Sequence, residues 1–127
     1  AVVLDMTLRD VQNETKKKGL PWTEAKAFDT SLALGAFIPK EDVKNPNDLH
    51  IWLSVDGKLR QSDSTKLMIY DVPTLIEAAS SVMTLSAGDI LCTGTPQGVS
   101  RVTPGQIMRA GIKGYEKSDI EFGVTKY

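Results

Sequence analysis

Apolar and polar side chains alternate most regularly around residue 52. The alternating run reads Leu49, His50, Ile51, Trp52, Leu53, Ser54 and Val55. A period of two is typical of a strand with one buried face. The Asp56-Gly57 pair that follows is a type I′ turn signal, so we expect residues 58–61 to return antiparallel as the second arm of a hairpin.

Four further stretches of the chain have strand character. Residues 2–6 form a short apolar run and are predicted to be a buried strand. The remaining strands are expected over 90–93, 106–113 and 117–124, with a tight turn near Gly114. An apolar strand exposed at a chain start would be an unpaired sheet edge, which natural domains avoid. We therefore expect that the sequence begins inside a larger domain and that residues before Ala1 are missing.

The first helix is predicted directly after the first strand. Thr7 and Asp10 have the spacing of a capping box, which would begin the helix. Lysines at 16–18 followed by Gly19 place cations and a glycine at its C-terminus, which is a common way for helices to end. Residues 20–23 are then expected to be irregular.

The second helix is predicted from Asp71, a capping residue with Pro73 two positions later. Apolar side chains then recur with the spacing of one continuous helical face, at Val72, Leu75, Ile76, Ala79, Val82 and Met83. Together the elements predict an α+β, mostly β fold with two helices, in one domain that covers residues 1–127.

Length and charge limit the classes of function. With 127 residues, the chain is long enough for one domain with a core and too short for two. Its 15 basic and 16 acidic residues give a net charge of −1, which gives no support for general binding to nucleic acid or to anionic membranes. No apolar run approaches the roughly 18 residues that cross a bilayer.

Cys92 and His50 are the single cysteine and the single histidine. They exclude a disulfide scaffold and a zinc site built from these side chains alone. Cys92 lies in an apolar run and is predicted to be a buried, inert thiol, which fits a reducing compartment. His50 falls on the outward phase of its strand and is interpreted as a surface residue. Trp22, beside Pro21, is predicted to pack in the interior.

Asp5 is the first candidate for site chemistry. A carboxylate at the end of a buried strand can bind a divalent cation, although capping the next helix is the more common role of such a residue. Arg9 and Gln12 are three positions apart and share one helix face. An arginine fork suits a carboxylate, and an amide can donate or accept. Taken alone, the pair fits a solvated helix face better.

Lys26 and the loop at 93–98 supply the remaining candidates. A lysine near a metal can neutralise a carboxylate or stabilise an enolate, but one lysine among 15 basic residues is weak evidence by itself. The loop reads TGTPQG, and its two glycines let a ligand approach the backbone closely. Thr95 and exposed amides of the loop can bind a carboxylate or an oxyanion. The loop lacks the glycine patterns of nucleotide-binding loops.

Taken in order, these motifs resemble the fumarylacetoacetate hydrolase family. The ordered set comprises LDMTLRDVQ at 4–12, KKKGLPWTEAKAFDT at 16–30, the Asp56-Gly57 hairpin, the second helix and GDILCTGTPQGV at 88–99. The closest branch looks like the acylpyruvate hydrolases and oxaloacetate decarboxylases, and the similarity covers essentially the whole chain. The resemblance implies a mixed β-roll, of the type of that family's C-terminal domain, and a homodimer.

The resemblance also implies roles for individual residues. Asp5 would be one of three carboxylate ligands of Mg²⁺ or Mn²⁺, the other two being glutamates of an upstream HxExE motif that this chain does not contain. Lys26 would contact the substrate and the developing enolate. The residues that would line the substrate pocket are Arg9, Gln12, Gly94 and Thr95. The histidine–glutamate pair that activates water in the family also lies upstream, so His50 is not assigned that role.

The implied reaction is cleavage of a C–C bond in a small 2-oxo acid through a metal-bound enolate. Acylpyruvate hydrolysis and oxaloacetate decarboxylation share this enolate, and its reprotonation without cleavage would make the protein an oxaloacetate keto–enol tautomerase. A non-catalytic scaffold or dimerisation fragment is the alternative from a different class. The 127-residue chain alone is expected to lack hydrolase activity, because two metal ligands and the water-activating pair are absent from it. Mitochondrial and cytoplasmic locations both fit, and neither nucleic acid nor a membrane is an expected partner.

Overall fold

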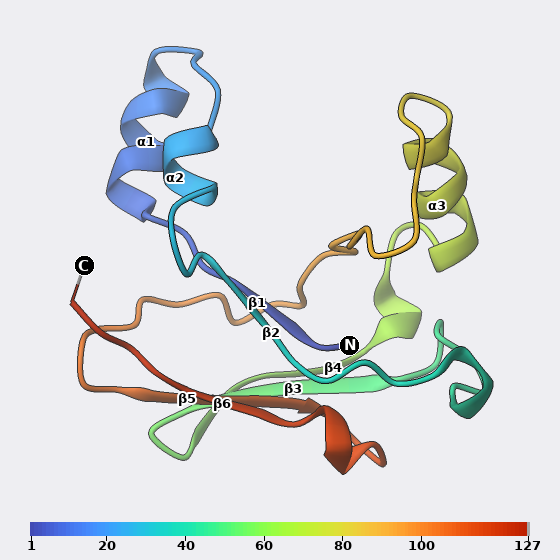
Figure 1. The fold of residues 1–127 in the computed structure, drawn as a ribbon. Coiled ribbons are helices and arrows are strands. Elements are labelled where there is room, and N and C mark those ends of the chain that lie inside the picture. The colour runs from blue at the N-terminus through green and yellow to red at the C-terminus, as the bar shows by residue number, and fades with distance from the viewer. Residues whose placement is uncertain (127) are drawn as a thin grey trace.

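The computed structural model describes residues 1–126, in which short strands alternate with three helices (Figure 1). The strands are β1 (Val3–Asp5), β2 (Leu32–Leu34), β3 (His50–Val55), β4 (Lys58–Ser64), β5 (Ile107–Ile112) and β6 (Ile120–Gly123). The helices are α1 (Arg9–Lys17), α2 (Thr23–Lys26) and α3 (Val72–Ser80), with 3₁₀ turns at Lys40–Asp42, Thr65–Leu67 and Glu116–Ser118. The predicted α+β, mostly β fold class is confirmed. Within the described part, none of the helices has the length and apolar character needed to traverse a bilayer.

Two antiparallel sheets organise the chain. The larger sheet has the strand order β4-β3-β5-β6, and the smaller one pairs β1 with β2. In the smaller sheet Val3 lies opposite Leu34, and Asp5 lies opposite Leu32. Figure 1 shows the four-stranded sheet along the bottom, α1 and α2 together at one end of the β1–β2 ribbon, and α3 apart from them on the other side.

The core lies where β1 meets the four-stranded sheet. Its buried apolar cluster consists of Leu4 from β1, Val55 from β3, and Met108 and Ala110 from β5. Burial of apolar surface contributes about 25 cal/mol per Å² to folding, so this cluster fastens β1 to the sheet. The strand that ends in Asp5 is therefore held by core packing one residue before its carboxylate.

The β3–β4 hairpin has the predicted turn. Asp56 and Gly57 have φ values of +49° and +73°, which are the left-handed conformations that a type I′ turn needs. The returning strand continues to Ser64, beyond the predicted end at residue 61.

A β-bulge interrupts the pairing of β3 with β4. Leu53 pairs with Gln61 and Ser54 pairs with Leu59, so Arg60 is an extra residue on β4. Neighbouring residues of a strand point to opposite faces of the sheet, and cross-strand partners share a face. The bulge therefore turns Gln61 to the face opposite that of Leu59, whereas regular alternation would place both on one face.

The prediction of a strand at 90–93 is wrong. These residues have no strand pairing, and Cys92 is exposed instead of buried. A short apolar run does not identify a strand by itself, because a strand also needs a partner for its backbone hydrogen bonds. The strand expected at 106–113 is confirmed as β5. The one expected at 117–124 begins with a 3₁₀ turn, so β6 is shorter than predicted.

α1 begins without the predicted capping box. Its N-cap residue is Leu8, and no side chain makes a cap hydrogen bond, because Thr7 lies one position too early. The predicted C-terminal end is confirmed, since the helix ends at Lys17 and Gly19 has a φ of +66°. Trp22 is the N-cap residue of α2 and is 46% exposed, so the predicted interior packing of its ring is wrong.

α3 begins as predicted and ends earlier. The Asp71 carboxylate accepts a hydrogen bond of 2.9 Å from the backbone nitrogen of Thr74, which caps the first turn. The helix ends at Ser80, so Val82 and Met83 lie beyond it. None of its nine residues is fully buried, although Val72, Leu75 and Ala79 are half-buried, so the described part of the chain covers its apolar face only in part.

Asp56 joins the hairpin turn to the start of β5. Its Oδ1 accepts a hydrogen bond of 2.9 Å from the backbone nitrogen of Ile107, and its Oδ2 accepts one of 2.8 Å from Gln106 Nε2. These bonds, the first more than the second, lower the pKa of the Asp56 carboxyl below its usual 3.8. The carboxylate therefore stabilises the fold above the unfolded pKa of 3.8, and this contribution is lost as the pH falls through the lowered value.

We expect Asp56→Asn to lower the Tm at neutral pH and to weaken the fall of the Tm in acid. Asparagine tolerates a positive φ, so the turn is kept while the charge is removed. Thermal unfolding of parent and variant from about pH 7 to about pH 3 checks the expectation. Asp29→Asn is the control, because Asp29 is exposed and makes no hydrogen bond within residues 1–126. An acid response of Asp56→Asn equal to that of the parent would contradict the linkage.

Candidate functional site

Asp5 and Lys26 form an ion pair although 21 positions separate them in the sequence. Lys26 Nζ lies 2.9 Å from Asp5 Oδ2, and the two side chains are 32% and 48% exposed. Asp5 is the last residue of β1, and Lys26 is the last residue of α2. The helix-capping role considered for Asp5 is wrong, because α1 has no side-chain cap hydrogen bond. The two candidates therefore share one place in the fold.

Backbone hydrogen bonds connect the segment after β1 with α2 and the residues that follow it. Leu8 N donates to Ala25 O at 3.1 Å, and Met6 N donates to Ser31 O at 2.7 Å. Ala25 itself is fully buried. An ion pair as exposed as that of Lys26 contributes about 0–1 kcal/mol, so the backbone, not the charges, sets its geometry. The sequence reading missed α2, because four residues are too few to show a helical period.

Arg9 and Gln12 contact each other on the first helix. Arg9 Nη1 donates to Gln12 Oε1, and Gln12 is only 6% exposed, so the solvated helix face favoured from the pair alone is wrong for Gln12. A guanidinium can only donate, which means that the oxygen of the Gln12 amide must face Arg9. No fully buried side-chain nitrogen or oxygen within residues 1–126 lacks a partner. The Gln12 amide nitrogen has no hydrogen-bond acceptor among these residues. It must therefore be at least partly exposed, and it can donate a hydrogen bond to a ligand.

The loop that contains Gly94 and Thr95 is fastened to strand β4. Gln61 Nε2 donates to Thr95 Oγ1 at 2.8 Å and to the carbonyl oxygen of Pro96 at 2.7 Å. Gly94 has a φ of +117°, and a Cβ added to it would meet no atom within 4 Å, so the backbone there is open to a ligand. Sequence reasoning missed Gln61, since only the bulged register turns it towards this loop.

The candidates form three pairs in the structure. Asp5 lies with Lys26, Arg9 with Gln12, and Gly94 precedes Thr95 in the loop held by Gln61. Within residues 1–126 no hydrogen bond or ion pair connects one pair to another. His50 is exposed, as predicted, and its Nε2 lies 2.8 Å from Ser62 Oγ.

The described residues do not form a cluster of metal-binding side chains. Within residues 1–126 no group of three or more histidine, cysteine, aspartate or glutamate side chains is placed to hold a metal ion. Asp5 fits one ligand position, because its Oδ2 carries the Lys26 contact while its Oδ1 accepts no hydrogen bond in the described region. A hard cation such as Mg²⁺ is commonly held by one or two carboxylates together with water and substrate oxygens.

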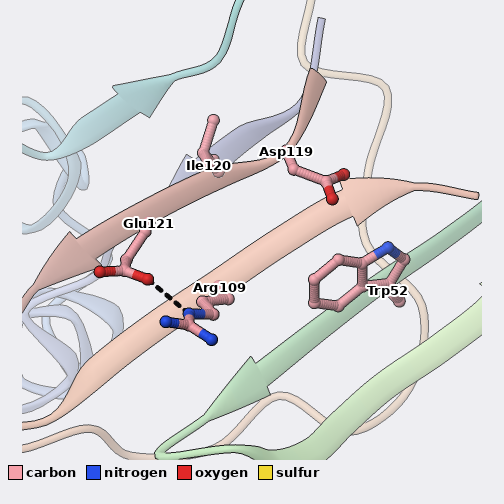
Figure 2. A pocket seen from close by; sticks show the side chains of 5 residues that line it. All are labelled: Trp52, Arg109, Asp119, Ile120 and Glu121. Atoms are coloured by element: carbon pink, nitrogen blue, oxygen red, sulfur yellow. Dashed lines mark hydrogen bonds and ion pairs between the residues drawn. The ribbon is translucent and has the colours of Figure 1, made fainter. Parts of the chain in front are cut away.

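A shallow hollow of about 250 Å³ lies elsewhere, on the four-stranded sheet (Figure 2). It is lined by Trp52, Arg109, Asp119, Ile120 and Glu121. Gly111 lets the Asp119 carboxylate lie close to the sheet backbone, because a Cβ there would lie 1.9 Å from Asp119 Oδ1 and 3.0 Å from Trp52 Nε1. None of the sequence-predicted site residues lines the hollow.

A family model described as "Fumarylacetoacetate (FAA) hydrolase C-terminal" matches residues 1–122 of the chain. Among solved structures, the fumarylpyruvate hydrolase from Pseudomonas aeruginosa in complex with Mn²⁺ and pyruvate superposes with a TM-score of 0.93 at 36% identity. The match covers 100% of this chain and 54% of that one. The predicted fold of the family's C-terminal type is therefore confirmed.

Two curated relatives are similar over nearly the whole chain. The "Oxaloacetate tautomerase FAHD2, mitochondrial" of Oryza sativa subsp. japonica is 53% identical over 126 residues, which cover 99% of this chain and 55% of that protein. The "Oxaloacetate decarboxylase, mitochondrial" of Dictyostelium discoideum is 47% identical over 123 residues, with 97% and 56% covered. The chain spans about half the length of the curated relatives it matches.

Gly98 and Gly94 allow a matched test of the loop's position. Both have a positive φ, of +100° and +117°, so an alanine at either position carries a conformational cost of about 1–3 kcal/mol. At Gly98 the added Cβ would also lie 2.1 Å from the backbone oxygen of Arg60, whereas at Gly94 it would meet nothing within 4 Å. We expect Gly98→Ala to lower the Tm more than Gly94→Ala in parallel thermal unfolding. Equal losses would contradict the contact between the loop and the bulge.

Proposed function

The chain belongs to the fumarylacetoacetate hydrolase family, and on that premise we propose that the complete protein is an enzyme of small 2-oxo acids. It cleaves a C–C bond, in acylpyruvate hydrolysis or in oxaloacetate decarboxylation. The names of its relatives support this substrate class, since they include an oxaloacetate decarboxylase and a fumarylpyruvate hydrolase. In this proposal, residues 1–127 are the C-terminal portion of one catalytic domain.

The ion pair between Asp5 and Lys26 is the observation that carries the proposal. It sets a carboxylate, suited to a hard cation, 2.9 Å from an ammonium group, suited to an anion. A 2-oxo acid would use both kinds of partner, because its acceptor oxygens suit a hard cation and its reaction develops further negative charge.

The other candidates act as donors. Arg9 can only donate, and the Gln12 amide is oriented with its nitrogen away from Arg9. Together with Lys26 they offer hydrogen bonds to a ligand that is rich in acceptor oxygens. A dicarboxylic 2-oxo acid has that character, since each of its carboxylates accepts several hydrogen bonds.

Asp5 is the residue of this chain that would hold a divalent cation, Mg²⁺ or Mn²⁺. When bound, the cation supplies a Lewis acid that withdraws electron density from the substrate's keto group. The presence of Mn²⁺ and pyruvate in the similar fumarylpyruvate hydrolase supports a divalent cation and a 2-oxo acid in such a site.

Lys26 stabilises the charge that develops during bond cleavage. As the bond between C3 and C4 of the substrate breaks, electron density moves to the keto oxygen, and an ammonium donor lowers the energy of that state. In oxaloacetate the departing group is CO₂. In an acylpyruvate, water first adds to the distal carbonyl, so the same enolate-stabilising donors serve both reactions.

Oxaloacetate keto–enol tautomerisation is the second candidate. The 53% identity to a rice protein named as an oxaloacetate tautomerase favours it. The chemistry differs only after the enolate forms, because a proton then returns to the substrate and no C–C bond breaks. The mitochondrial names of the relatives favour a mitochondrial location, and a homodimer is our proposal for the assembly.

Assay of the complete protein with oxaloacetate and Mg²⁺ separates these outcomes. Accumulation of pyruvate supports decarboxylation, and a faster decay of the enol absorbance without pyruvate supports tautomerisation. Acetylpyruvate tests the hydrolase reaction in the same way. Calorimetry with Mg²⁺ and oxalate tests the non-catalytic alternative, because a scaffold that keeps the fold without the site gives no binding heat.

We expect Lys26→Ala to reduce kcat in the complete protein by about 10²–10³-fold, the usual loss for one donor to a developing oxyanion. Binding of Mg²⁺ should change little, because Asp5 is retained. Calorimetric titration with Mg²⁺ and steady-state kinetics measure the two effects separately. Lys17→Ala is the control, since it removes an exposed ion pair with Glu14 on α1. Near-normal turnover by Lys26→Ala would remove Lys26 from the mechanism.

A further inference from the structure

Gln61, which was not among the candidates from the sequence, makes two side-chain hydrogen bonds to the loop at 93–98. Both hydrogens of its amide nitrogen are used, one on Thr95 Oγ1 at 2.8 Å and one on the Pro96 carbonyl at 2.7 Å. It comes from β4, whereas the loop lies more than 30 positions later, as the separations of 34 and 35 residues show.

The Pro96 carbonyl fixes the orientation of the Gln61 amide. A carbonyl oxygen can only accept, so the group that faces it must be the amide nitrogen and not the amide oxygen. The same nitrogen then also faces Thr95 Oγ1, and the Thr95 hydroxyl must accept from it. The direction of both hydrogen bonds follows from chemistry, without any assumption about hydrogen positions.

The Thr95 hydroxyl is left with one hydrogen to donate. A hydroxyl has one donor hydrogen and two acceptor lone pairs, and the bond from Gln61 occupies a lone pair. Within residues 1–126 the Thr95 hydroxyl donates to no acceptor. Its hydrogen is therefore available for an oxygen atom of a ligand.

The bulge at Arg60 makes this arrangement possible. It turns Gln61 to the opposite face from Leu59, and it brings the Arg60 carbonyl so close to Gly98 that a Cβ there would lie 2.1 Å away. Bulges of this kind re-aim side chains near functional sites. The bulged segment of β4 thus contacts the loop both before Pro96, at Thr95, and after it, at Gly98.

We propose that Gln61 is a positioning residue that sets the Thr95 hydroxyl as a hydrogen-bond donor to a carboxylate oxygen of the substrate. This inference rests on the proposed function, because the proposed function identifies the ligand as a 2-oxo acid. Gln61 acts through Thr95 and does not itself contact the substrate. Loss of the amide nitrogen should therefore weaken binding of a carboxylate ligand without removing a catalytic group.

Gln61→Glu is the first test, made in the complete protein with Mg²⁺. A carboxylate at this position accepts the Thr95 hydrogen and so reverses the direction of the bond. We expect the Kd for oxalate, measured by calorimetry, and the KM for oxaloacetate to rise about 10- to 100-fold, with a smaller change in kcat. Gln97→Glu is the matched control, because Gln97 is exposed and makes no hydrogen bond within residues 1–126. This variant adds the same charge to the loop itself and leaves the Gln61 hydrogen bonds in place.

A double-mutant cycle with Thr95→Val tests whether Gln61 acts through Thr95. Thr95→Val should weaken oxalate binding to a similar degree, and adding Gln61→Glu to it should cost little more. A merely structural role for Gln61, through Pro96, predicts additive losses instead and would overturn the proposal. Gln61→Met, which removes the donor without adding charge, should give an intermediate loss and serves if Gln61→Glu fails to fold.

The outcomes separate this proposal from the proposed function. If the parent binds oxalate but leaves oxaloacetate unchanged, the function is wrong, while weak oxalate binding by Gln61→Glu still supports the positioning role. If the parent converts oxaloacetate and Gln61→Glu binds oxalate as tightly as the parent, the positioning role is wrong and the function stands. A parent that binds no oxalate overturns the positioning role, because the Thr95 hydroxyl then has no carboxylate to bind.

Discussion

The ion pair between Asp5 and Lys26 is the constraint on which the candidate site depends. Its own energy is small, because both side chains are partly exposed and such pairs contribute about 0–1 kcal/mol. Its geometry comes from elsewhere. Leu4 packs in the core one residue before Asp5, and the buried Ala25 stands one residue before Lys26. Packing therefore brings the two charges together, and they remain accessible to a ligand that can compete for both.

The direction of hydrogen bonds unites the rest of the site. Arg9 donates to the Gln12 oxygen, which leaves the amide nitrogen of Gln12 as a donor. Gln61 donates to the Thr95 oxygen, which leaves the hydroxyl hydrogen of Thr95 to donate in turn. In each pair an obligate donor fixes a group that could otherwise act either way. The resulting excess of donors matches a ligand with many acceptor oxygens, which is a physical argument for an anion independent of any similarity to known proteins.

The sequence was most informative where a pattern is local. The hairpin turn at Asp56-Gly57, the cap at Asp71 and the end of α1 at Gly19 all depend on a few adjacent residues, and each was correctly predicted. The segment at 90–93 was wrong, because strand formation depends on a partner that a local pattern does not contain. The same limit explains Trp22, whose exposure follows from its place before α2 and not from its own apolar ring.

The site was predictable only in part for a related reason. Asp5 and Lys26 were identified as candidates, but their contact depends on the pairing of β1 with β2 and on α2, which no periodicity revealed. Gln61 was not identified at all. A regular strand would place it on the same face as Leu59, and one extra residue in β4 reverses that assignment. Such a bulge breaks the rule on which strand predictions rest, and this is common where a protein positions functional groups. Regular alternation of side chains along β4 would therefore place Gln61, the residue proposed to orient Thr95, on the face of the sheet opposite to the one it occupies.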